Sequence, residues 1–101
     1  MTNTSNLAEA REVLDNLIAL LKRENMEGLL PGLYRLRRRL EKEELDIGET
    51  QQLKASLHGL YAHKESIAFA QIWKDTLEER IVANKELQDM RERLRLLVES
   101  L

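Results

Sequence analysis

The stretch that decides the fold is the C-terminal one, residues 60–101, which reads LYAHKESIAFAQIWKDTLEERIVANKELQDMRERLRLLVESL. It contains no Gly and no Pro, the residues that most often end or interrupt a helix. As one helix it would be about 63 Å long at roughly 1.5 Å per residue, whereas a compact domain of this size has a radius of gyration of about 13 Å. We therefore expect this stretch to bend, to protrude or to pair with another chain.

A heptad repeat within this stretch is the strongest pattern in the chain. One set of residues seven apart contains Phe69, Thr76, Ala83, Met90 and Leu97. The second set, four residues later, contains Trp73, Arg80, Leu87, Leu94 and Leu101. Such a seam, here with two polar exceptions, is typical of a left-handed coiled coil or a helical bundle. A shorter apolar patch, formed by Ala70, Leu77 and Ile81, lies about 90° or more around the same helix.

These two patterns predict a helix over about residues 66–101 that pairs with another chain, in the first place a second copy of itself. The sequence leaves open whether this helix is continuous with the one before it. Packing within a single chain requires the same heptad spacing and is the alternative.

Three shorter helices are expected before it. The first covers about residues 7–24 with Asn6 as its N-cap, and the second covers about 29–44 with Pro31 in its first turn. The third covers about 47–63 and begins with a capping box formed by Asp46 and Glu49. We predict an all-α fold of three to four helices in one domain, 1–101, in which an antiparallel N-terminal pair packs on the long C-terminal helix.

The composition narrows the class of protein. Aromatic residues are 4% of the chain, so a sheet is not expected. Charged residues are 34% of the chain and give a net charge of −2. This balance argues against a protein that binds nucleic acid or anionic lipid with its whole surface. No apolar run approaches the roughly 18 residues of a membrane span, and residues 1–6 are polar and show no secretory signal. We expect a cytoplasmic protein without a membrane partner.

No pattern of catalytic or metal-binding residues is present. His58 and His63 would lie about 140° apart on one helix, so they cannot share a metal ion at the usual i,i+4 spacing. The chain has no Cys, its glycines are scattered singly, and its serines lie in no nucleophile motif. We predict that the protein is not an enzyme and that it has no catalytic residues, no cofactor and no metal ion.

A basic run, Arg35–Arg39, is the one local excess of positive charge. On a helix its outer face forms a basic stripe of Arg35, Arg38, Arg39 and Lys42. This stripe could contact a phosphate backbone or an acidic partner, and nucleic-acid binding through it is our alternative function. A solvated outer face, neutralised by pairs such as Arg37 with Glu41, explains the same pattern.

The segment from Ala10 to Asp15, followed by Lys22 and Arg23, resembles the first helix of the small helical chorismate mutases. The resemblance covers about 15 residues of one amphipathic helix, a pattern that many helices share. It implies a dimeric all-α enzyme whose long helices supply Arg and Lys to a dicarboxylate substrate. The family's later basic residues do not appear here at the same spacing, so no residue role is carried over.

We therefore interpret the chain as a small helical protein–protein interaction module, acting as a regulator, adaptor, chaperone or inhibitor through an apolar helix face. The residues expected to anchor its partner are Phe69, Trp73, Leu77, Ile81, Leu87, Met90, Leu94 and Leu97.

Overall fold

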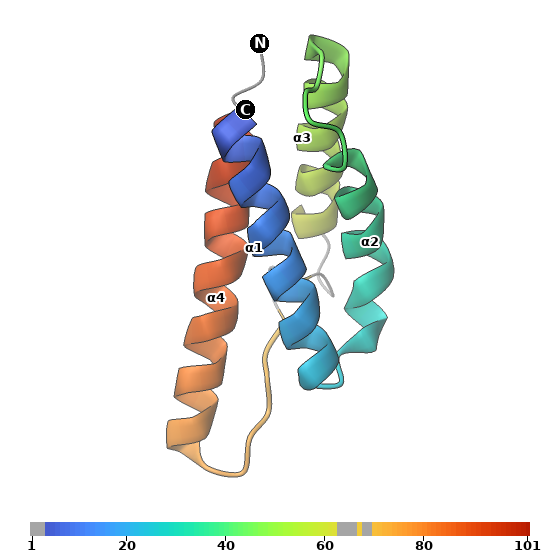
Figure 1. Ribbon diagram of the computed structural model, residues 1–101. Coiled ribbons are helices and arrows are strands. Elements are labelled where there is room, and N and C mark those ends of the chain that lie inside the picture. The colour runs from blue at the N-terminus through green and yellow to red at the C-terminus, as the bar shows by residue number, and fades with distance from the viewer. Residues whose placement is uncertain (1–3, 63–66, 68–69) are drawn as a thin grey trace.

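The computed structural model describes residues 4–62, 67 and 70–101, and within these ranges it contains helices and no strand. The elements are α1 (Thr4–Arg23), the 3₁₀ turn η1 (Glu27–Leu29), α2 (Leu30–Arg39), α3 (Ile47–Ala62) and α4 (Leu77–Glu99). Successive helices alternate in direction (Figure 1). α1 packs on α2 and α4, and α3 packs on the same two helices, so the four form a ring around one core. The predicted all-α fold is confirmed.

Leucine side chains fill this core. Those with no exposed surface come from all four helices and from the C-cap residue that follows α2: Leu7, Leu14, Leu17, Leu21, Leu33, Leu40, Leu53, Leu57, Leu87 and Leu94. Each contributes about 1.5–3 kcal/mol relative to an exposed position, which is the main favourable term for a chain of this size. α1 packs most extensively against α4, so the two helices farthest apart in the sequence form the largest helix pair.

α4 is shorter than predicted. The expectation of a helix from about residue 66 is wrong for residues 70–76, which are not helical. The cause is a local cap: Thr76 has extended backbone angles, and its hydroxyl oxygen accepts a hydrogen bond from the Glu79 N–H at 3.1 Å. The spacing of Thr76 and Glu79 is that of a capping box, which starts a new helix at Leu77.

The shorter α4 also removes the length argument for a second chain. With 23 residues it is about 35 Å long, close to the roughly 30 Å of the 20-residue α1. α1 can therefore cover the heptad seam within the same chain, as the packing alternative requires. A coiled coil between chains is not needed to bury Leu87 and Leu94.

Two other helix ends differ from expectation, and one agrees. Asn6 lies inside α1, where its side-chain amide donates to the Ser100 hydroxyl at 2.7 Å, so it is not the N-cap. α2 ends at Arg39 and not near residue 44, because acidic residues are unfavourable at a helix C-terminus and the buried Leu45 turns the chain back to the core. The Asp46–Glu49 capping box is confirmed by reciprocal hydrogen bonds of 2.7 and 3.3 Å.

Candidate functional site

Large apolar side chains gather at the start of α4. Trp73, Leu77, Ile81 and Val82 are 74%, 65%, 59% and 69% exposed, and we call them the α4 patch. Leu77 and Ile81 lie one turn apart on the same face, and Val82 lies about 100° farther around the helix from Ile81. The first turns of α4, together with the chain before them, extend beyond the ends of α1 and α2 (Figure 1). This position leaves the patch open to solvent.

The segment before α4, residues 70–76, is bound to the helix and places Trp73 in the patch. We call it the strap. Asn84 holds it by accepting from the Ile72 N–H at 2.7 Å and donating to the Ile72 carbonyl at 2.8 Å. Its amide also donates to the Arg80 carbonyl at 2.8 Å. The Arg91 guanidinium donates to the Ala70 carbonyl at 3.1 Å, and the Ile72 side chain is buried.

An ion pair joins the strap to the end of α1. The Lys74 ammonium lies 2.6 Å from one carboxylate oxygen of Glu24 and 2.9 Å from the other. The Glu24 side chain is only 9% exposed, yet its pKa is lowered, chiefly because Lys74 donates a hydrogen bond to the ionised carboxylate. Arg23 contributes in the same direction. The strap is therefore fixed to two helices.

This pair predicts a pH dependence of stability. In the folded chain the pKa of Glu24 lies below its usual value of 4.5. The ion pair therefore contributes its full stabilisation at pH values above this usual pKa. The contribution is lost as the pH falls through the lower pKa of the folded chain. At neutral pH Glu24→Gln should destabilise the chain by about 1 kcal/mol, and the difference from wild type should vanish once the pH is below the folded-state pKa of Glu24. Thermal unfolding at several pH values measures this.

Asp89→Asn is the matched control, because among the described residues Asp89 pairs only with Lys85, in an exposed i,i+4 ion pair. It should change stability little at any pH. A Glu24→Gln deficit that stays constant down to low pH would contradict the role given to the carboxylate charge.

Arg80 completes the patch. Its guanidinium carbon lies 4.0 Å from the centre of the Trp73 ring, a cation–π arrangement that holds the exposed ring in place. The Arg80 Nε atom is buried and has no hydrogen-bond partner among the described residues. Arg80 is one of the two polar residues in the heptad seam, and its contact with Trp73 of the strap explains its presence there. The spacing of residues along a helix could not reveal this contact.

The remaining predicted anchors lie elsewhere, and Phe69 is outside the described residues. Leu87 and Leu94 have no exposed surface, and Met90 and Leu97 are partly buried against the same core. They were expected to bind a partner, but their face of α4 is covered by α1. In the folded monomer a second chain cannot reach Leu87 or Leu94 unless the bundle opens.

The four residues of the basic stripe have different partners in the structure. Lys42 lies beyond the end of α2 and forms an ion pair with Glu49, which raises the pKa of Lys42 and lowers that of Glu49. Arg39 donates to the Gln52 side-chain oxygen at 3.3 Å. Arg35 and Arg38 are exposed and form no ion pair with any described residue. Two of the four cations therefore stay fully available to a partner.

Arg37 does not neutralise the stripe in the way we expected. Its partner is not Glu41 but Asp15 of α1, at 2.7 Å. This ion pair joins α2 to α1 and leaves Arg35 and Arg38 unaffected.

Metal and membrane sites can be assessed for the same part of the chain. His58 is exposed on α3, 3.5 Å from a Glu99 carboxylate oxygen, and His63 lies outside the described residues. Residues 4–62, 67 and 70–101 contain no group of three or more His, Cys, Asp or Glu side chains placed to hold a metal ion. None of the helices in these ranges is long and apolar enough to cross a membrane.

Comparisons with protein-family models, with curated proteins and with solved structures found no match for this chain.

Proposed function

We propose that this protein is a small helical protein–protein interaction module whose binding surface is the α4 patch. The observation that carries the proposal is that four large apolar side chains are more than half exposed at one end of a helix whose other face is core. Apolar patches on the surface of a folded chain commonly mark interaction sites, and tryptophan is enriched among the residues that dominate binding energy. The protein acts as a regulator, adaptor, chaperone or inhibitor by occupying a helical surface.

The partner is an apolar helix face, in the first place the same patch on a second copy of the chain. Three ion pairs lie near the patch: Lys74 with Glu24, Arg23 with Glu86, and Lys85 with Asp89. Asp75, Glu78 and Glu79, which flank Leu77, are exposed and form no ion pair with any described residue. Two copies related by a two-fold axis bring the same surface together and bury the exposed apolar side chains of both. The exposed apolar surface, and not the charge at its rim, supports self-association.

Nucleic-acid binding through the basic stripe is less well supported. A protein that relies on phosphate contacts typically makes about 6–10 of them. Here Lys42 is paired with Glu49, and Arg39 contacts Gln52, which leaves Arg35 and Arg38. Two unpaired guanidinium groups, and a third that contacts a neutral amide, are fewer than such a backbone contact requires.

Sedimentation equilibrium tests the proposal. At tens of micromolar the wild-type mass should approach twice the 11.8 kDa of one chain. Leu77→Asp with Ile81→Asp should give a folded monomer, because both side chains are exposed and a buried, unpaired carboxylate opposes association by several kcal/mol.

Leu96→Asp is the control, since Leu96 is also more than half exposed on α4 but lies outside the patch. This variant should remain dimeric. A wild-type monomer over the whole concentration range would show that a second copy is not the partner. Dissociation by Leu96→Asp to the same extent would show that the patch is not the interface.

A further inference from the structure

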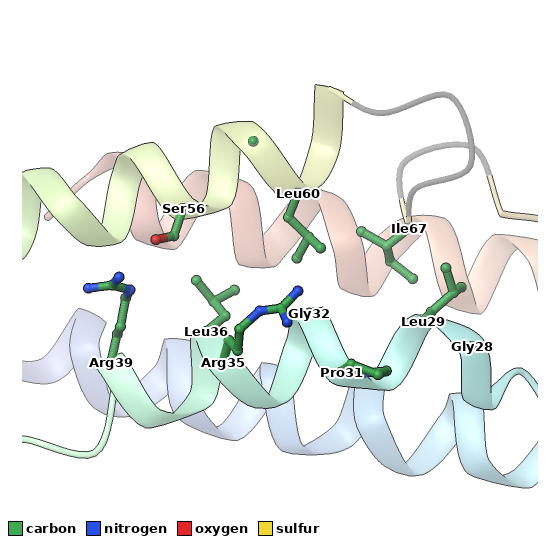
Figure 2. A pocket seen from close by; sticks show the side chains of 11 residues that line it. Gly28, Leu29, Pro31, Gly32, Arg35, Leu36, Arg39, Ser56, Leu60 and Ile67 are labelled. Atoms are coloured by element: carbon green, nitrogen blue, oxygen red, sulfur yellow. The ribbon is translucent and has the colours of Figure 1, made fainter.

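A cleft on another side of the bundle, between α2 and α3, has the features of a ligand site. Its volume is about 490 Å³, within the roughly 300–1,000 Å³ that is usual for small-molecule pockets. Leu29, Pro31 and Leu60 supply accessible apolar surface, and Arg35, Arg39 and Ser56 supply polar groups (Figure 2). We call it the α2–α3 cleft.

The charge of the cleft is positive although the chain carries a net charge of −2. Arg35 and Arg39 extend from α2 on one side, and the Ser56 hydroxyl lies across from Arg39 on α3 (Figure 2). No acidic residue is among the described residues that line the cleft. The Arg39 guanidinium donates a hydrogen bond to the neutral side chain of Gln52. Arg35 has no hydrogen bond or ion pair with any described residue. Two guanidinium groups thus lie beside apolar surface, and no described residue of the lining supplies a neutralising carboxylate.

Two glycines shape the space between the helices. A Cβ atom at Gly32 would lie 2.6 Å from Leu60 Cδ1, so this glycine allows α2 and α3 to approach closely. A Cβ atom at Gly59 would meet nothing within 4 Å, although glycine inside a helix is less stable than alanine. Packing therefore does not require glycine at position 59, and its effect is to keep the wall of the cleft open.

We propose that the α2–α3 cleft binds a small organic anion, consisting of a carboxylate or phosphate group on a short apolar body. Arg35 and Arg39 hold the anionic group, because guanidinium groups match both carboxylate and phosphate with paired N–H donors. The Ser56 hydroxyl donates a further hydrogen bond, and Leu29, Pro31 and Leu60 contact the apolar body. This site is independent of the α4 patch and of the proposed self-association.

Binding of three probes to the full chain tests the charge requirement. The probes are octanoate, octyl phosphate and neutral octanol, each below its micelle concentration, followed by calorimetry and by amide NMR shifts. At least one of the two anions should shift the amides of the cleft residues and bind at least about tenfold more tightly than octanol, since charge-assisted hydrogen bonds are about twice as strong as neutral ones. The order of the two anions identifies the preferred head group. Equal binding of octanol, or shifts confined to the α4 patch, would overturn the proposal.

Matched variants test the residues. Arg35→Gln should weaken binding of the preferred anion at least about tenfold, whereas Arg38→Gln, on the same helix but outside the cleft, should leave it unchanged. Gly59→Leu should block binding while thermal stability stays equal or rises, because a helix former replaces glycine and its side chain fills the cleft. If Arg38→Gln weakened binding of the anion as much as Arg35→Gln, the effect would come from the overall charge of the helix and not from the cleft. If Gly59→Leu bound the anion as tightly as the wild type, the ligand site would lie outside the cleft.

Discussion

Leu94→Asp is expected to unfold the protein. Leu94 has no exposed surface and lies in the core that α4 shares with α1. The substitution removes the packing of a buried leucine, which is worth about 2–5 kcal/mol, and adds the cost of burying a carboxylate without a partner. A domain of this size is stable by only about 5–15 kcal/mol, so most or all of its stability should be lost. Circular dichroism and thermal unfolding measure the effect.

Leu96→Asp makes the same chemical change two residues farther along the same helix. Leu96 is 54% exposed, and its replacement should change stability by about 0.5 kcal/mol or less. The comparison also separates two interpretations of the heptad seam. If Leu94 faced a second chain, Leu94→Asp would give a folded monomer with full helix content, which would contradict the intrachain packing described above.

Asn84→Ala is expected to release the strap. The side chain makes three hydrogen bonds, two to the backbone of Ile72 and one to the Arg80 carbonyl. Leaving partly buried backbone groups unpaired costs about 1–3 kcal/mol each, so we expect a loss of about 2–3 kcal/mol, as part of the strap becomes solvated. The Ile72 amide should exchange with solvent much faster than in the wild type.

Trp73 gives this prediction a second readout, because it is the chain's single tryptophan and lies in the strap. Its fluorescence should change when its stacking on Arg80 is lost. Gln88→Ala, one turn farther along α4 at an exposed position, should alter neither measurement. Unchanged protection of the Ile72 amide in Asn84→Ala would show that the strap is held by its other contacts.

Local signals in the sequence predicted those parts of the fold that depend on neighbouring residues. The Asp46–Glu49 capping box marked the start of α3, since both partners lie within one turn. Thr76 and Glu79 have the same kind of spacing, but the absence of Gly and Pro around them predicts one long helix that includes both. A helix can begin at a favourable cap without a helix-breaking residue, and this explains the error at the start of α4.

Burial along α4 was easier to predict than the identity of the covering helix. The heptad spacing placed Leu87 and Leu94 on an apolar face, but the same spacing serves an intrachain neighbour and a second chain. The exposure of Leu77 and Ile81 depends on where α1 ends in space, which is a property of the whole bundle. The role of Asn84 could not be predicted, because a lone polar residue in a helix gives no signal of a bond to a non-helical segment.

The pairing of α1 with α4 has a consequence for synthesis of the protein. α1 meets its most extensive partner only after the intervening helices and α4 have been made, which takes about 4–15 s at about 5–20 residues per second. During that interval α2 can cover only one side of the wide apolar face of α1. Side chains such as Leu7 and Leu14 then remain in water on the nascent chain, where they are natural targets for ribosome-associated chaperones.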